Sequence, residues 1–386
     1  MDMKRTVILS LVLSTILTIK LQSQEQNRAI TTSTPFLLIA SDARAAGLAD
    51  QGVATSADVF SQQWNPAKYA FIKNKQGVGV NYTPYLSNLV NDIFLGNINY
   101  HNRLNERSAV AASFRYFSLG EIEFRETADQ LGLIQKPNEL TIDISYALKL
   151  DERFSMAVAG RYLRSDLRLS TTNSDDTAPG SGFGVDIAGF YRSDEIAFRS
   201  FNGRWRAGVS VSNIGPKIKY DDAGQENFIP TNFRLGGSFD FIFNDENRIT
   251  PSIEFSKLLV PTPQDFDGDG VIGVEDTNEY NEISEYSAIF SSWGDAPDGF
   301  SEELKEIIWS LGAEYMYQDV FAFRAGYFNE SEEKGARKFL SLGAGFKYNI
   351  VNLDISYLFS TSAVRSPLEG TLRFGLSFNF GDEYYD

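Results

Sequence analysis

Apolar and polar residues alternate along most of the chain beyond residue 75. The last such segment places Leu372, Phe374 and Phe378 on one face and Arg373 and Ser377 on the other. A period of two residues is typical of a β-strand whose two faces meet different surroundings. Fourteen segments follow this pattern, at residues 76–85, 92–101, 108–118, 139–150, 153–165, 182–192, 203–214, 231–243, 247–258, 306–318, 320–328, 337–348, 350–360 and 369–380.

The connections between these segments alternate in length. Every second one is tight, as at Asp151 and Glu152, and the connection 193–202 is the longest of this short class. The longer polar stretches are 119–138, 166–181, 215–230 and 259–305. Short turns at one end, long loops at the other and an even strand count are typical of an outer-membrane β-barrel. The sequence therefore predicts an all-β fold, a 14-stranded antiparallel transmembrane β-barrel, over residues 76–386.

A soluble β-sandwich or propeller would alternate in the same way, with its apolar face in a packed core. Small or charged residues on the polar face and aromatic residues near segment ends favour the membrane. These aromatic residues are Tyr100, Tyr116, Tyr162, Tyr191, Tyr327 and Tyr357. We therefore expect an integral protein of a Gram-negative outer membrane.

The first residues have the pattern of an export signal. Lys4 and Arg5 precede an apolar stretch, Val7 to Ile19, which is too short to span a membrane as a helix. We expect a signal peptide over residues 1–23. Beyond it, no run of about 18 apolar residues predicts a membrane helix.

Composition narrows the possible functions. The chain has 30 Phe, 18 Tyr and 31 Gly, which favours strands over helices. The absence of cysteine excludes a lipoprotein acylated on that residue. A formal net charge of −16 argues against nucleic acid as a partner, because phosphates require a basic surface.

The segment before the first strand, residues 24–75, is rich in alanine and does not alternate, so we expect a hatch or plug inside the barrel. Its Trp64, Asn65, Pro66 and Ala67 resemble the stretch that closes the hatch of the FadL superfamily of fourteen-stranded barrels. Within that superfamily, the stretch SDARAAGLA (41–49) followed by Gly-Val-Ala resembles the PorV family of the Bacteroidetes type IX secretion system.

That resemblance implies a non-enzymatic role in protein secretion. PorV-like proteins dock on the lateral gate of an SprA-like translocon and receive cargo with C-terminal sorting domains. They pass this cargo to a PorU-like sortase complex, which attaches it to lipopolysaccharide or releases it. A filled lumen would be compatible with this role, since the loops and the lipid-facing wall would then be the working surfaces.

Apolar residues in the long polar loops are the predicted contacts for cargo and partners, because water disfavours such groups unless they are covered. The alternative is that the loops fold over the barrel mouth and these residues pack on one another. The residues are Leu131, Leu133, Ile134, Phe228, Ile229, Phe290, Trp293 and Phe300.

Other functions remain open. A FadL-type transporter of hydrophobic small molecules would share the fold and the hatch, with a path opened by a strand kink near Ser118 to Gly120. A lipopolysaccharide deacylase would need His101, the single histidine, which lies where a strand meets a short turn. We therefore predict no catalytic site. Because the chain has one histidine and no cysteine, a metal site built from several His and Cys side chains is also excluded.

The stretch DFDGDGVIGVED, residues 265–276, has the spacing of a twelve-residue calcium loop. Pro261 and Pro263 are incompatible with the entering helix of an EF-hand, and the last position is an aspartate in place of the usual glutamate. A solvated acidic turn is the alternative. The predicted Ca²⁺ ligands are Asp265, Asp267, Asp269, Val271 and Asp276.

Overall fold

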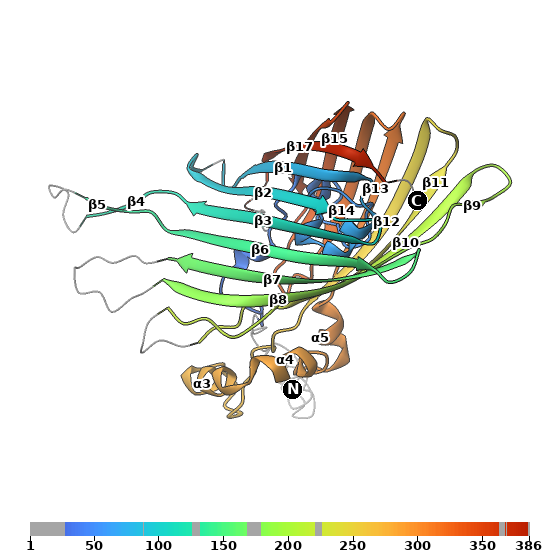
Figure 1. Cartoon of the computed structure of the whole chain (residues 1–386). Coiled ribbons are helices and arrows are strands. Elements are labelled where there is room, and N and C mark those ends of the chain that lie inside the picture. Colours follow the sequence, from blue (N-terminus) through green and yellow to red (C-terminus); the bar gives the residue numbers. More distant parts are fainter. Residues whose placement is uncertain are drawn as a thin grey trace, which may run out of the picture.

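A computed structural model describes residues 28–384, except 88, 126–131, 168–178, 221–225, 363–366 and 368. The long strands in this part of the chain are β1 (Asn74–Pro84), β2 (Ile93–Arg103), β3 (Ser108–Leu119), β6 (Asn138–Lys149), β7 (Phe154–Asp166), β8 (Gly180–Arg192), β10 (Asn202–Ile214), β11 (Asn232–Ile242), β12 (Asn247–Leu258), β13 (Ile308–Tyr317), β14 (Phe321–Asn329), β15 (Lys338–Tyr348), β16 (Val351–Ser360) and β17 (Leu372–Glu383). Each pairs antiparallel with its neighbours, and the sheet closes because β1 pairs with β17 (Figure 1). The predicted 14-stranded barrel is confirmed.

The two faces of the barrel wall reverse the usual order of a soluble protein. On β17, Phe374 and Leu376 point outward and are 47% and 37% exposed, whereas Arg373 and Ser377 point inward and are buried. On β6, Ile144 is 64% exposed and Asp143 is buried. An apolar outer face around a polar interior requires lipid as the outer solvent, which excludes the soluble sandwich and propeller.

The fourteen segments expected from the sequence coincide with the long strands within a few residues. Short elements occur in the connections between them. A hairpin of β4 (Ile122–Phe124) and β5 (Leu133–Gln135) extends the loop after β3, and β9 (Ile196–Ala197) adds to β10 in the connection 193–202. The suspected kink near Ser118 lies at the end of β3, whose pairing with β2 and β6 is continuous.

One irregularity interrupts the wall between β8 and β10. The register shifts between Val211 and Ile214, and Asn213 adopts a left-handed conformation with φ of 62°. Asn213 donates its backbone N–H to Asp186 at 2.7 Å and its side-chain amide to the carbonyl of Pro230 at 2.8 Å. This bulge directs the following loop across the inner face of β8, where Gly180 and its neighbouring glycines leave room for it.

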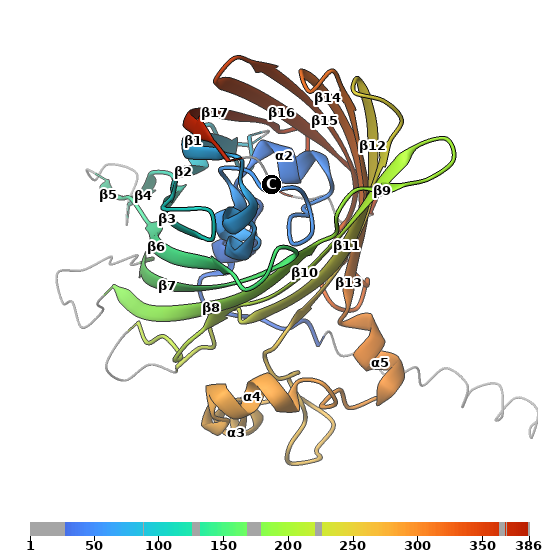
Figure 2. The same ribbon diagram turned by 45° about the vertical axis from the view of Figure 1, so that its right-hand side comes forward.

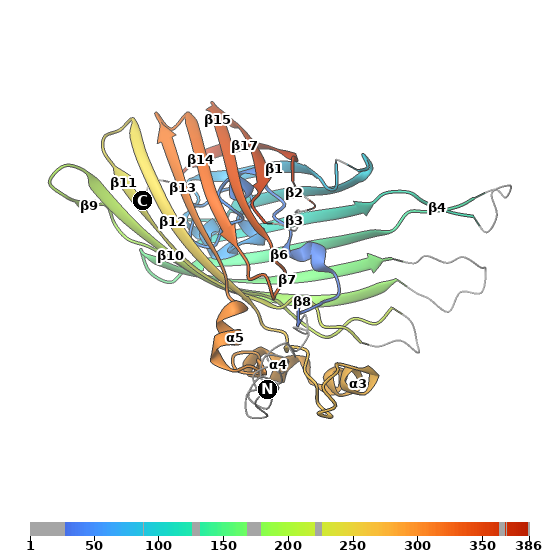
Figure 3. The same cartoon turned by 180° about the vertical axis from the view of Figure 1, so that it is seen from behind.

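The two ends of the barrel differ. At the turn end, short connections such as residues 318–320 and 349–350 join the strands, and β1 begins there. At the loop end lies the outer loop, residues 259–305, which contains α3 (Val274–Glu282), α4 (Glu285–Ser291) and α5 (Phe300–Lys305). Figures 1 and 3 show these helices outside the barrel, beyond the strands. Across the described residues, no helix has both the length and the apolar character needed to cross a membrane.

Candidate functional site: the filled lumen and the outer loop

The interior of the barrel holds residues 34–72, here called the lumen segment (Figure 2). It runs from the loop end to the start of β1 and forms short helical turns. These are η1 (Pro35–Leu38), α2 (Ala43–Gly47), η2 (Ser61–Gln63) and η3 (Pro66–Phe71). Its backbone approaches the wall so closely that a Cβ added at Gly208 would lie 2.0 Å from the carbonyl oxygen of Val53. The absence of a side chain at this position therefore permits the contact.

Inward-facing carboxylates of the wall bind the lumen segment. Oε2 of Glu254 accepts the backbone N–H groups of Gly52 and Val53 at 2.8 and 2.9 Å. The guanidinium of Arg44 donates to Asp58 at 2.7 Å and to Glu314 at 3.1 Å. Glu314 also accepts from Arg324 on the neighbouring strand. Each of these buried charges thus has a partner, which is the condition for holding ions in a site with little water.

The four residues of the predicted hatch motif are all buried inside the barrel. Nε1 of Trp64 donates to Asp42 at 2.6 Å. The amide of Asn65 caps η3 through the N–H of Ala67 and donates to the carbonyls of Val53 and Gly189, both at 2.9 Å. Pro66 is the first residue of η3, where its fixed φ suits a helical start. The motif therefore joins two stretches of the lumen segment to strand β8.

Ion pairs anchor the outer loop to the barrel rim. Nζ of Lys257 lies 2.7 Å from Glu303 and 2.5 Å from Glu306, and Nζ of Lys334 lies 2.6 Å from Glu302 and 2.9 Å from Glu306. Burial disfavours the charge of Glu306, but the hydrogen bonds from Lys257 and its other donors outweigh this and lower its pKa. The pKa of Glu302 is lowered in the same way, against burial, chiefly by Lys334. These residues were not predicted from the sequence, where their only signal is charge next to strand ends.

The predicted partner contacts fall into two groups. Phe228 and Ile229 are buried: Phe228 packs against Tyr280 of α3, and Ile229 lies in the core with Phe36. They therefore offer no open surface. Five others are exposed, with fractions of 46% for Leu133, 53% for Ile134, 80% for Phe290, 48% for Trp293 and 76% for Phe300. Leu131 lies outside the described residues.

The carboxylates of Asp265, Asp267 and Asp269 have oxygen atoms within 4.8 Å of one another at the start of the outer loop. The N–H of Asp269 lowers the pKa of Asp267, but burial and the neighbouring carboxylates outweigh it and raise the pKa. This repulsion is the kind that a hard cation relieves. Asp276 instead accepts the backbone N–H groups of Gly273 and Phe266 and caps α3, and the exposed Val271 lies in the same turn.

A second group of carboxylates, Asp295, Glu303 and Glu306, also lies within 4.8 Å. Here Nζ of Lys257 already contacts two of the three side chains. The ammonium group supplies the positive charge that these carboxylates need. The described residues thus contain two clusters of three carboxylates. Lys257 balances the charge of the second cluster, whereas no lysine contacts the aspartate turn among these residues.

An apolar cavity of about 580 Å³ opens at the loop end, above the lumen segment. Phe36, Ile39, Phe117 and Ile308 contribute to its walls. Charged residues, among them Lys334, lie at its edge. A cavity of this size and lining suits a hydrophobic ligand.

His101 points into the lumen and is fully buried. Its ring stacks on Tyr69 with centroids 5.6 Å apart, and Nε2 lies 3.4 Å from the carbonyl oxygen of Asn74. These contacts tie β2 to the lumen segment. In the described part of the chain, no serine or carboxylate is hydrogen-bonded to this ring, so the geometry gives no support to a catalytic triad.

The sequence model of the family described as "Type IX secretion system protein PorV" matches residues 22–265. A search of curated protein sequences finds no match.

Solved structures share the fold at low sequence identity. The Pseudomonas putida toluene transporter TodX is 10% identical, with a TM-score of 0.50, over 89% of this chain and 99% of that one. A Pseudomonas aeruginosa FadL homologue is 12% identical, with a TM-score of 0.46, over 89% and 99% of the two chains. The likeness to TodX supports the FadL-like barrel fold.

Proposed function

Because the chain belongs to the PorV family of type IX secretion proteins, we propose that it is a docking and shuttle subunit for secreted proteins. In this proposal it docks on the lateral gate of an SprA-like translocon and receives cargo carrying a C-terminal sorting domain. It then passes the cargo to a PorU-like sortase complex, for attachment to lipopolysaccharide. It carries out no chemical step itself.

The filled lumen is the observation that carries the proposal. The lumen segment is tied to strands on several sides of the barrel, through Glu254, Glu314 and Gly189. Opening a path would break these buried contacts together, which is costly. We propose that residues 24–75 serve as a plug and that the barrel, with its interior occupied in this way, acts through its outer surfaces.

The outer loop offers the most suitable surface for docking. Phe290 on α4 and Phe300 on α5 are its most exposed aromatic residues, and Lys257 and Lys334 fix the loop to the rim. Aromatic side chains held on an ordered support lose little entropy on binding, and they often dominate the free energy of an interface. We therefore propose that these helices contact the translocon or its cargo.

Copurification tests this proposal. A tagged chain is extracted in mild detergent, and the translocon and cargo that travel with it are quantified. The variant Phe290→Ser with Phe300→Ser should lose most of both partners. The matched control, Leu104→Ser with Ile350→Ser, removes two exposed apolar residues at the turn end and should retain them. Equal recovery in both variants would contradict the proposed surface.

A FadL-type transporter is the second candidate, and the apolar cavity at the loop end favours it. The unbroken pairing of β3 with β2 and β6 weighs against it, because the expected lateral opening at this strand is absent. Mass spectrometry of lipid extracted from the purified protein separates the two candidates. A stoichiometric hydrophobic ligand, together with unimpaired secretion in a deletion strain, would favour transport.

A further inference from the structure

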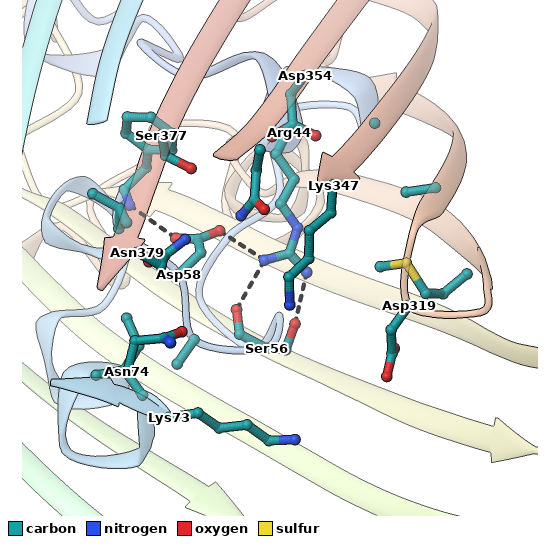
Figure 4. A pocket seen from close by; sticks show the side chains of 18 of the residues that line it. Arg44, Ser56, Asp58, Lys73, Asn74, Asp319, Lys347, Asp354, Ser377 and Asn379 are labelled. Atoms are coloured by element: carbon teal, nitrogen blue, oxygen red, sulfur yellow. Dashed lines mark hydrogen bonds and ion pairs between the residues drawn. The ribbon is translucent and has the colours of Figure 1, made fainter. Parts of the chain in front are cut away.

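A second pocket, of about 290 Å³, lies at the turn end of the barrel (Figure 4). The lumen segment forms one side of it through Ser56 and Asp58, and the chain between that segment and β1 contributes Lys73. The ends of strands form the other side, with Lys347 from β15 and Arg204 from β10. The short turns of outer-membrane barrels face the periplasm, so this pocket would open to a compartment that the outer loop cannot reach.

The charge of the pocket is opposite to that of the chain. Among the described residues that line it, eight are Arg or Lys and three are Asp, although the whole chain has a formal net charge of −16. We therefore expect acidic partners to be repelled by the chain's overall charge and attracted at this pocket. Such local focusing is the usual way in which an electrostatic field selects a binding site.

The cations at the floor of the pocket already have partners. Arg44 binds Asp58 and Glu314, Arg206 binds Asp240, and Arg324 binds Glu314 and an aspartate of β16. These pairs hold the lumen segment and the wall together. The floor thus supplies a rigid base and little net attraction.

The cations at the edge are different. Lys73 and Lys347 line the pocket from separate elements, and neither forms an ion pair within the described residues (Figure 4). Arg204 pairs with Glu195 at 3.4 Å through its guanidinium, but its Nε is buried and has no hydrogen-bond acceptor in the described part of the chain. Arg248 pairs with Asp319, whose side chain is 65% exposed. Acceptors supplied by a ligand would satisfy these donors.

We propose that this turn-end pocket binds an acidic, extended segment of a periplasmic protein. Its volume admits a few carboxylate side chains and excludes a folded domain. A phospholipid headgroup could not reach it, because the pocket lies within the ring of strands and the barrel wall separates it from the bilayer. Lipopolysaccharide lies in the outer leaflet, at the opposite end. Carboxylates between Lys73 and Lys347 would form charge-assisted hydrogen bonds at short range.

Fluorescence anisotropy with labelled hexaglutamate tests the proposal on the purified full-length protein in detergent, at about 50 mM salt to limit screening. We expect one hexaglutamate per barrel. The variant Lys73→Ser with Lys347→Ser should bind at least about tenfold more weakly. The control Lys136→Ser with Lys219→Ser removes the same charge from exposed loop-end lysines and should bind like the unaltered protein. Heat-modifiable gel migration verifies that every variant is folded.

Three results would overturn the proposal. The first is no binding of hexaglutamate to the unaltered protein, and the second is an equal loss in the two double variants. The third is that pyrophosphate displaces the labelled hexaglutamate at the same concentration at which unlabelled hexaglutamate does, which would indicate a site for small anions. None of these results bears on the outer loop, so the proposed function stands or fails separately.

Discussion

Glu314 illustrates how single residues hold the interior together. This one carboxylate accepts from Arg44 of the lumen segment and from Arg324 of the adjacent strand. The alternation of the sequence predicts that Glu314 points inward, but its partner Arg44 lies 270 residues earlier in the chain. Strand periodicity carries no information about contacts at that separation, so the network could not be derived from the sequence alone.

Removing the guanidinium of Arg44 should destabilise the protein. Arg44→Met keeps most of the side-chain volume but removes an ion pair from the buried Glu314 and from the partly buried Asp58. We expect the free energy of unfolding to fall by about 3 kcal/mol, the usual cost of breaking a buried pair. Urea unfolding in lipid vesicles, followed by tryptophan fluorescence, measures it. Arg125→Met is the control, because its pair with Glu123 is nearly half exposed and should contribute less than about 1 kcal/mol.

At the scale of elements, the strands were predictable and the outer loop was not. A strand that separates lipid from a polar lumen must alternate apolar and polar residues, as Leu372 to Phe378 does. Such a strand can therefore be predicted from its sequence. The stretch VEDTNEYNE of α3 has no apolar stripe of helical period, so nothing in it predicts a helix. Asp276 fits both a calcium ligand and a helix cap, and only the fold shows that it serves as the cap.

Acid should release the outer loop from the rim. The pKa values of Glu302 and Glu306 are lowered in the folded state, so their ion pairs stabilise the attached loop fully above pH 4.5, the ordinary pKa of a glutamate. This stabilisation is lost as the pH falls through the lowered pKa values of the two side chains. Proteolysis by pepsin should therefore cut near α5 increasingly below about pH 4. Lys334→Met should raise the pH at which cutting begins, and an unchanged onset would contradict the anchoring role.

Calcium should bind the aspartate turn. We expect a dissociation constant of about 0.1–1 mM by calorimetry, typical of extracellular sites with few ligands. Asp267→Asn with Asp269→Asn should abolish the heat. The control Glu282→Gln removes an exposed charge from the same loop and should leave it unchanged. Absence of heat from the unaltered protein would refute the site.

The whole molecule is a closed wall around a fixed interior, and locking that interior should leave secretion intact. A Cβ built on Gly375 of β17 lies 3.5 Å from Cβ of Ala43, within the range for a disulfide, although the Asn81 side chain, whose Oδ1 would collide with that Cβ, must turn aside. The unaltered chain has no cysteine. Ala43→Cys with Gly375→Cys should therefore crosslink on oxidation. If the lumen segment never moves, oxidised cells secrete cargo as well as reduced ones. A defect that a reductant reverses, and that neither single variant shows, would instead support a moving hatch.

The lumen segment also determines the timing of assembly. Exported from its N-terminus, the chain delivers Gly52 and Arg44 long before Glu254 and Glu314, which lie 202 and 270 residues further on. The alanine-rich stretch must therefore cross the periplasm without the carboxylates that will hold it. Closure of the seam between β1 and β17 waits for the last strand to arrive. During that interval the earliest part of the chain is exposed to aggregation, so we expect it to stay soluble while still unfolded.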